Sequence, residues 1–319
     1  AMKKEESGRV SFGTFHSVFY QILRLAYGFP AGSVIGEEEK RGFFKEFLAK
    51  SSLEVEDEGE FISSVISEIS HVKEERLDLR SYYSQNCPEE WFKKLYRGYE
   101  EMLHRTGKLD FDDMLVMCYD LFSKRKDILA AWQRKYRYIL VDEFQDINRL
   151  QYEIVRMLAL PENNLFIVGD DDQSIYRFRG AKPEIMLGFE KDYPDAARVL
   201  LSYNYRSTRE IVSASLRLIG HNKVRFPKEL KPSHGAGRPA DLRIYENPVR
   251  EMEAAARELR LYRQAGYAYE DMAVLFRTGL SMGLLAEKLM EYNVPFQMRD
   301  VVPSLYSHWI AKDFFAYLS

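Results

Sequence analysis

Three short apolar runs that end abruptly in polar residues constrain the fold of this chain more than any other feature. They are residues 138–141 before Asp142 and Glu143, residues 165–168 before Gly169, and residues 199–201 before Ser202. Short β-rich runs separated by helical sequence are typical of strands buried on both faces of a parallel sheet. Because ligands of open α/β sheets bind beyond the carboxyl ends of the strands, the polar residues there are the first candidates for function.

Helical sequence precedes these runs. Thr14 is a candidate cap for a helix from Phe15 to about Tyr27, which follows a predicted short strand at residues 9–13. Residues 37–124 carry apolar stripes at helical spacing, with no strand-like alternation among them. We therefore predict an all-helical subdomain ahead of the parallel strands.

A linker rich in proline, glycine and histidine at residues 229–239 leads to a second predicted α/β unit. Its predicted elements are strands at residues 242–245 and 272–276 and helices at residues 250–265, 280–292 and 311–318. The chain is 46% apolar and 30% charged, which predicts folded domains rather than disorder. Its length suits about two of them.

Charge and cysteine content narrow the class of protein. The net charge of −3 argues against a protein that binds polyanions with its whole surface. Residues 198–231 hold eight bases and two acids, so we expect any nucleic-acid binding from a local patch. No apolar run reaches the roughly 18 residues of a membrane span, and Cys87 and Cys118 lie far apart without metal-ligand neighbours. We expect a reduced, cytoplasmic protein with no membrane partner.

The strongest functional signal is three strings that occur in order, each at the end of a predicted strand. They read ILVDEFQD from Ile139, VGDDDQSIYRFRGA from Val168 and YNYRST from Tyr203. Together they resemble motifs II, III and IV of the superfamily 1 DNA helicases of the UvrD, Rep and PcrA type. Two further strings, GTFHS from Gly13 and LDFDDML from Leu109, resemble other segments of that family, so the resemblance extends over nearly the whole chain.

The resemblance implies an α/β fold. The expected architecture is an incomplete RecA-like P-loop NTPase domain with an all-helical insert, followed by the beginning of a second RecA-like domain. The implied divisions are a partial domain 1A at residues 1–34 and 110–200, a helical subdomain 1B at residues 35–109, and a partial domain 2A at residues 201–319.

Residue chemistry and the resemblance together predict an ATP site. Asp142 at a strand end suits Mg²⁺, which prefers oxygen ligands, and Glu143 beside it suits a general base for the attacking water. By resemblance, Gln173 senses the γ-phosphate, Tyr205 stacks on the adenine, and Arg206 neutralises transition-state charge. Arginine fingers contribute about 10³ to 10⁵ to the rate in other NTPases.

Three further residues, Gln145, Asp146 and Arg179, are predicted to couple the ATP site to DNA. For each of the three residues the alternative is a purely structural role. Gln145 and Asp146 would otherwise only fix the loop of their own motif, and Arg179 would form an internal salt bridge.

The candidate contacts to single-stranded DNA are Thr14, Phe15, His16, Tyr176, Arg177 and Phe178. Tyr176 and Phe178 alternate along an extended stretch with arginines beside them, and bases stack on aromatic rings without sequence preference. Phe178 stands where the family usually has tryptophan, so it offers a smaller stacking face. His16 lies so close to the predicted helix start that a role in the cap region is the alternative.

The phosphate-binding string of this family, G-x-x-x-x-G-K-[ST], does not occur in the 319 residues. We therefore expect ATP and Mg²⁺, the cofactors of the family, to bind this chain alone weakly or not at all, without ATP hydrolysis. The first hypothesis is the central portion of a nucleoid-associated 3′→5′ DNA helicase of repair or replication, with a separate chain as one possible source of the loop. The alternative is an ATPase-dead DNA-binding or protein-interaction module from a truncated helicase gene.

Overall fold

The computed structural model describes residues 10–51, 53, 55–176, 180–299 and 309–318. The chain divides into two compact units, residues 1–235 and residues 236–319, and each is described by itself. The division expected at residues 200 and 201 from the resemblance stays a prediction.

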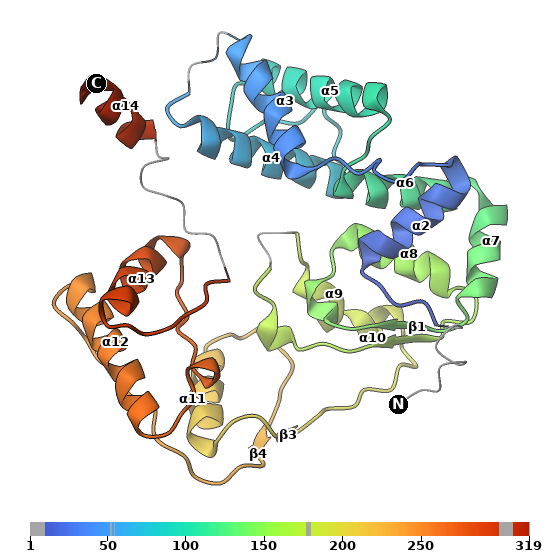
Figure 1. The fold of residues 1–319 in the computed structure, drawn as a ribbon. Helices are drawn as coiled ribbons and strands as arrows, with labels where there is room; N and C mark the ends of the chain where they lie inside the picture. The colour runs from blue at the N-terminus through green and yellow to red at the C-terminus, as the bar shows by residue number, and fades with distance from the viewer. Residues whose placement is uncertain (1–9, 52, 54, 177–179, 300–308, 319) are drawn as a thin grey trace. The chain divides into compact units, whose positions relative to one another are not determined.

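Unit 1 is mostly helical and contains two pairs of parallel strands (Figure 1). Its helices are α2 (Phe15–Tyr27), α3 (Glu37–Ala49), α4 (Glu58–Glu74), α5 (Glu89–Thr106), α6 (Phe111–Lys124), α7 (Lys126–Lys135), α8 (Arg149–Ala159), α9 (Pro183–Leu187), α10 (Phe189–Asp192) and α11 (Arg209–Ile219). The strands are β1 (Ile139–Val141), β2 (Leu165–Ile167), β3 (Tyr203–Asn204) and β4 (Lys231–Pro232), and the 3-10 turns are η1 (Phe144–Asp146) and η2 (Asp171–Gln173).

Helix α2 begins and ends where the sequence predicts. The Thr14 hydroxyl accepts the backbone N–H of Ser17 at 3.3 Å, which caps the first turn. Gly28 ends the helix with φ 76, a left-handed conformation that glycine adopts without a steric penalty. The apolar face between these caps is buried against α6.

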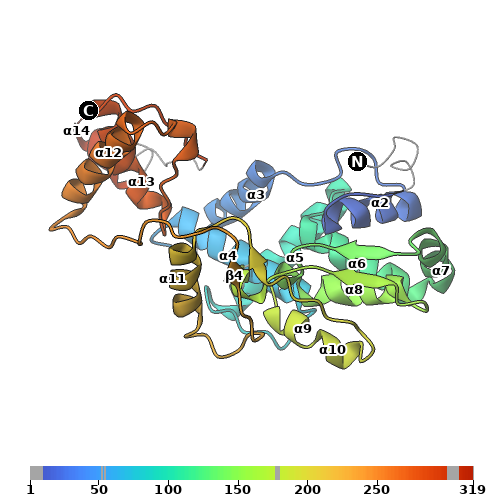
Figure 2. The same cartoon turned by 90° about the horizontal axis from the view of Figure 1, so that it is seen from below.

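The helical sequence predicted ahead of the parallel strands forms helices α3, α4 and α5, which share one core (Figures 1 and 2). Large side chains at helical spacing fill it, among them Phe44, Val65, Phe92 and Tyr99. A single bridge closes the insert at its base, where the N–H of Ile35 donates to the carbonyl of Leu109 at 3.1 Å. The chain therefore enters and leaves the insert at adjacent points.

Strands β1 and β2 pair in parallel, with Leu140 opposite Phe166. Val141 and Ile167 contribute to a core completed by helices α8, α9 and α10. Because side chains alternate along a strand, Leu140 and Phe166 lie on the opposite face, where they are 72% and 60% exposed. The prediction that these strands are buried on both faces is wrong for the described residues, because the helices cover one face only.

Four predicted strands do not form. Residues 10–13, 199–201, 242–245 and 272–276 have no strand pairing, and the third string instead places strand β3 at its own first two residues. A β-rich sequence becomes a strand only when a neighbour accepts its backbone hydrogen bonds. Leu242 and Ile244 are accordingly about nine-tenths exposed, at 88% and 91%.

Unit 2 consists of α12 (Pro248–Gln264), α13 (Met282–Glu291), α14 (Trp309–Leu318) and the turns η4 (Tyr269–Asp271) and η5 (Gly279–Ser281). The helices predicted here are confirmed. Its small core joins α12 to α13 through Met252, Ala256, Leu285 and Leu289. No helix in the described part of either unit is long and apolar enough to span a bilayer.

A buried lysine joins the helical insert to α6. Lys73 in α4 has a side chain only 3% exposed and pairs with Asp110 at 3.1 Å, Asp113 at 2.7 Å and Glu100 at 2.6 Å. Asp110 is the N-cap of α6 and also accepts the Tyr99 hydroxyl at 3.1 Å. Burial disfavours a charged lysine, but these carboxylates outweigh it and raise the pKa of Lys73.

Replacing Lys73 with methionine is expected to lower the free energy of unfolding by about 3–5 kcal/mol, because buried carboxylates lose their partner. Denaturant unfolding followed by circular dichroism measures this loss. Lys50→Met is the control: it also removes an ion pair, with Glu46 at 2.5 Å, but both side chains are mostly exposed. A loss below about 1 kcal/mol is expected there. Equal losses in the two variants would contradict the weight given to the buried lysine.

Glu74, the last residue of α4, carries a perturbed carboxyl beside α8. Its Oε1 accepts a hydrogen bond from the side-chain amide of Asn148, the N-cap of α8, at 2.9 Å. Burial, reinforced by the charge of Asp112, raises the pKa of Glu74 to about 7. This carboxyl therefore changes charge near neutral pH in the folded chain.

Because the folded pKa of Glu74 lies above its ordinary value of 4.5, folding favours the protonated form. The resulting destabilisation is absent at acid pH, grows as the pH rises above about 4.5 and is complete above about 7. Glu74→Gln, which keeps an acceptor for Asn148, is therefore expected to gain Tm relative to the parent as the pH rises from about 5 to 8. Glu101→Gln, at an exposed position of α5, is the control for a lost charge. A Tm difference for Glu74→Gln that stays constant across this range would refute the raised pKa.

Candidate functional site

The loop after β1 presents two acidic side chains. Asp142 and Glu143 are both exposed, and Asp142 Oδ1 accepts the backbone N–H of Glu143 at 2.9 Å. Glu143 has φ 51 and ψ 42, in the left-handed region that residues with a Cβ rarely occupy. Such backbone costs on the order of 1–3 kcal/mol and is concentrated at functional sites. The strained residue here is the predicted general base.

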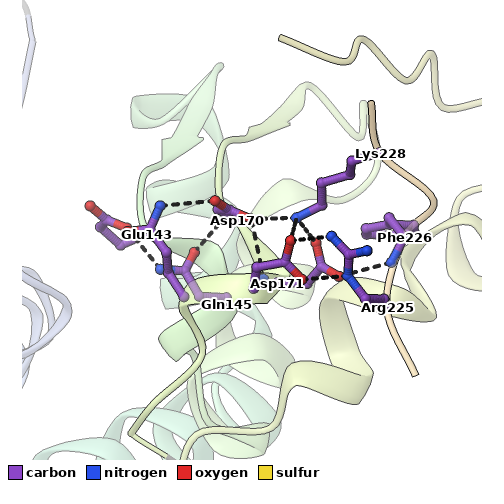
Figure 3. A network of polar contacts seen from close by, with 9 residues as sticks. Glu143, Gln145, Asp170, Asp171, Arg225, Phe226 and Lys228 are labelled. Carbon is purple, nitrogen blue, oxygen red and sulfur yellow. Dashed lines mark hydrogen bonds and ion pairs between the residues drawn. The ribbon is translucent and has the colours of Figure 1, made fainter. Parts of the chain in front are cut away.

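Gln145 joins this loop to the loop after β2 (Figure 3). It is 2% exposed; its Nε2 donates to Glu143 Oε2 at 2.8 Å, and its Oε1 accepts the backbone N–H of Asp170 at 3.0 Å. One buried amide therefore sets the position of the Glu143 carboxylate relative to the end of β2. This geometry supports the loop-fixing interpretation of Gln145, and its coupling to DNA stays a prediction.

Gly169 makes this close approach possible. A Cβ at this position would lie 2.6 Å from Gln145 Oε1 and 3.1 Å from the backbone nitrogen of Phe144. The amide is buried and paired at both ends, so it has no room to move aside. A residue other than glycine would push the two loops apart.

Asp146 differs from its neighbour Gln145 in its hydrogen bonding. Its Oδ1 is buried and accepts no hydrogen bond from the described residues. Burial, reinforced by the charge of Glu143, raises the pKa of Asp146. A buried acceptor without a donor is uncommon in folded proteins. Its two predicted roles, in coupling and in fixing the loop, both stay predictions.

Gln173, the predicted sensor, ends the turn η2 after β2. Its Nε2 donates to Asp170 Oδ2 at 2.9 Å, and the residue is exposed. Glu143, Gln145, Asp170 and Gln173 thus form a continuous chain of hydrogen bonds across the ends of β1 and β2. The structure thus links the predicted base, Glu143, to the predicted sensor, Gln173, through two intervening residues.

Three consecutive carboxylates follow β2 and are neutralised from a distant part of the chain (Figure 3). Lys228 pairs with Asp170, Asp171 and Asp172, the last at 3.1 Å, and its side chain is 8% exposed. Arg225 holds both oxygens of Asp172, its Nε donating to Oδ1 at 2.7 Å. We call the three carboxylates the acidic triplet.

The two cations keep Asp170 and Asp172 ionised. Burial disfavours the charge on Asp170, but hydrogen bonds from Lys228 and Gln173 outweigh it and lower the pKa of this carboxyl. A hydrogen bond from Arg225 lowers the pKa of Asp172. Because both pKa values lie below the ordinary 3.8, the ion pairs persist throughout the neutral range.

The third string forms a turn organised by Asn204. Its Oδ1 accepts the backbone N–H of Arg206 at 3.0 Å, and Tyr205 between them is 71% exposed. Among the described residues, no hydrogen bond or ion pair links the Arg206 side chain to the loops after β1 and β2. The convergence of Tyr205 and Arg206 with those loops on one nucleotide therefore stays a prediction.

The three predicted DNA contacts at the start of α2 differ in their exposure to solvent. Thr14 is exposed, whereas Phe15 packs against the cores around α6 and around β1 and β2. His16 lies 5.1 Å from Phe111, ring to ring, and burial lowers its pKa despite the opposing charge of Asp112. Burial thus favours a neutral His16, which carries no charge for a phosphate. DNA contact by these residues stays a prediction.

The predicted stacking stretch is described only in part. Tyr176 is 38% exposed, and its carbonyl accepts the N–H of Ala181 at 3.3 Å. Arg177, Phe178 and Arg179 lie outside the described residues. Base stacking by Tyr176 and Phe178, and the coupling role or salt bridge of Arg179, therefore stay predictions.

The roles of Arg225 and Lys228 were not predicted from the sequence. Both belong to the basic run at residues 198–231, which we interpreted as a patch for nucleic acid. The structure pairs them with carboxylates of the same chain, so they are not free to contact phosphates. The acidic triplet was the available signal, because adjacent carboxylates need cations nearby when they are buried.

Asp142 fits the Mg²⁺ that the resemblance implies. Its carboxylate is exposed at a strand end and receives only the adjacent N–H of Glu143 as a described hydrogen bond. Mg²⁺ in nucleotide sites usually takes one or two carboxylates together with water and substrate phosphates. The acidic triplet does not fit the metal as well, because its oxygens are already held by Lys228 and Arg225.

Comparisons with known proteins identify the family of this chain. The family model of the UvrD/REP helicase N-terminal domain matches residues 1–194, and that of the UvrD-like helicase C-terminal domain matches residues 199–319. The putative ATP-dependent DNA helicase YjcD of Bacillus subtilis is 36% identical over 97% of this chain and 41% of its own length. The ATP-dependent DNA helicase PcrA of Staphylococcus epidermidis is 33% identical over 98% of this chain and 44% of its own length.

These matches extend along both units. PcrA of Leuconostoc citreum is 34% identical over 93% of this chain and 41% of its own length. The chain thus spans less than half the length of the curated relatives it matches. The matched helicase domains imply a RecA-like α/β fold, in agreement with the parallel strands and the acidic residues at their ends. The chain belongs to the UvrD/Rep family of DNA helicases.

Proposed function

We propose that this chain is the central portion of an ATP-dependent DNA helicase or translocase that moves 3′→5′ along single-stranded DNA in repair or replication. The observation that carries the proposal is the hydrogen-bonded chain from Glu143 through Gln145 and Asp170 to Gln173. It spans the ends of two parallel strands, the edge at which open α/β sheets bind ligands. The similar proteins are ATP-dependent DNA helicases by name, which supports nucleotide chemistry at that edge.

In this proposal the loop after β1 carries the hydrolytic step. Asp142 holds Mg²⁺, which neutralises charge on the phosphates of bound ATP. Glu143 takes a proton from the water that attacks the γ-phosphorus as the bond to ADP breaks. Gln145, donating to Glu143 Oε2, keeps that carboxylate directed toward the water.

The later strings complete the proposed site. Gln173 contacts the γ-phosphate and reports its loss to the DNA-binding stretch that begins at Tyr176. Arg206 neutralises charge on the transferred phosphoryl group, and Tyr205, whose ring is largely exposed, stacks on the adenine. The site thus needs both the loops after β1 and β2 and the turn around Asn204.

The alternative function is that of an ATPase-dead module; the phosphate-binding string does not occur in these 319 residues. An ATPase-dead module that binds DNA or another protein would need neither the string nor Mg²⁺. The two functions differ in what a phosphate-binding loop supplied by another chain would do. It would restore ATP hydrolysis only if the residues retained here form a working half-site.

The 319-residue chain alone is expected to release no phosphate from ATP above the protein-free background, because the loop that binds the phosphates is not in its sequence. A coupled phosphate-release assay with Mg²⁺ and single-stranded DNA measures this. A fluorescent ATP analogue should bind weakly or not at all. Micromolar binding of the analogue that Asp142→Ala abolishes would overturn the prediction of an incomplete site.

Single-stranded DNA is expected to bind with an affinity that falls linearly on a log–log plot against salt concentration. Tyr176→Ala and Phe178→Ala should each lower this affinity by about 1–3 kcal/mol, roughly 5- to 150-fold, because each removes a stacking ring. Fluorescence anisotropy with a labelled oligothymidine measures both effects. Tyr83→Ala, which removes a 74% exposed ring from the helical insert, is the control and should bind as the parent does. Parental affinity of the Phe178→Ala chain would rule out the stacking role.

A further inference from the structure

Residues 225–234, which we call the strap, contact two loops of the site at once. At the first end, Lys228 and Arg225 neutralise the acidic triplet after β2. The backbone N–H of Phe226 adds a hydrogen bond to Asp171 Oδ2 at 2.8 Å (Figure 3). The Lys228 and Asp171 side chains are 8% and 2% exposed, so this end is held by ion pairs that are largely withdrawn from water. Separating such partners would leave charges buried without compensation.

The other end of the strap pairs with the turn of the third string. Strand β4 lies parallel to β3, with the N–H of Lys231 donating to the carbonyl of Ser202 at 2.7 Å. The N–H of Ser233 donates to the carbonyl of Asn204 at 2.8 Å. His234 Nε2 donates to the next carbonyl, that of Tyr205, at 2.7 Å. This end is therefore fixed by hydrogen bonds to backbone carbonyls rather than by ion pairs.

The two ends are too close together to move independently. Only Glu229 and Leu230 separate the buried Lys228 from strand β4. Even fully extended, the chain from Lys228 to Lys231 spans at most about 11 Å at about 3.3–3.6 Å per residue. A displacement of the loop after β2 must therefore either break the ion pairs or pull on β4.

We propose that the strap is a positioning element, with Lys228 as its positioning residue, that fixes the loop bearing Gln173 relative to the turn bearing Arg206. The inference rests on the proposed function, which assigns these two side chains to one nucleotide. A change at the γ-phosphate sensed by Gln173 would then reach Arg206 through the strap. The acidic triplet serves as the anchor of the strap rather than as a cation site.

Hydrogen exchange resolved to single amides, on the 319-residue chain without nucleotide or DNA, tests this directly. In Lys228→Met, the amides of Phe226, Lys231 and Ser233 should exchange about tenfold faster or more, while α6 keeps its parental protection. Lys228→Arg restores the charge and should return most of the protection at Lys231 and Ser233. Lys124→Met is the matched control, because it removes a 75% exposed lysine that pairs with Asp120 at 2.9 Å.

Faster exchange confined to Phe226, with Lys231 and Ser233 unchanged, would overturn the strap, because its two ends would then be independent. If Lys228→Met also loses protection in α6, a variant at the other end of the strap, Ser233→Pro, decides whether the two ends are coupled. Ser233→Pro removes one backbone donor at the far end and, since coupling is reciprocal, should speed exchange at Phe226. Ser233→Ala keeps the donor and is its control. Parental exchange at Phe226 in Ser233→Pro overturns the proposal.

The exchange experiment does not depend on nucleotide binding, so its failure is separable from failure of the proposed function. Loss of coupling between the strap ends counts against the strap alone. Failure of single-stranded DNA to bind, with the coupling intact, counts against the proposed function and leaves the strap as a structural link.

Discussion

The buried ion pair between Lys73 of α4 and Asp110 is the interaction on which the rest of unit 1 depends. Lys73 reaches from the helical insert to Asp110, and Asp110 caps α6, the helix that packs against α2, α4, α7 and α8. One ammonium group therefore fixes both the insert and the start of the central helix. Removal of either partner leaves an unpaired charge in the interior. Substitutions at this junction should therefore cost more stability than substitutions in an apolar contact of the same area.

In unit 1, few residues are needed to hold polar side chains at the carboxyl ends of β1 and β2. Gln145 is the central residue, since its single amide contacts the Glu143 carboxylate and the backbone of Asp170, which lie in the loops after two neighbouring strands. Gly169 leaves room for it. Glu143 itself has a left-handed backbone, a strain that the well-packed turn η1 sustains. The site is thus held in shape before any ligand arrives.

Local features of this protein were predictable and long-range ones were not. The cap at Thr14, the helices of the insert and the placement of Asp142 after β1 all follow from residues a few positions apart. The pairing of Lys228 with Asp170 joins residues 58 positions apart, and no local pattern specifies it. The failed strand at residues 199–201 has the same cause, because its sequence favours a strand while its backbone lacks a partner. The packing of the partly buried Phe15 likewise depends on helices distant in sequence.

The number of residues between Lys228 and Lys231 fixes the distance from the ion pairs to strand β4. Its two intervening residues, Glu229 and Leu230, contact neither loop through a described hydrogen bond, so their identities are weakly constrained. Their number is not, because one residue more or fewer would turn β4 over relative to β3 and move every donor to the wrong side. Substitutions should therefore accumulate freely in this interval among homologous chains, whereas insertions and deletions should be absent from it.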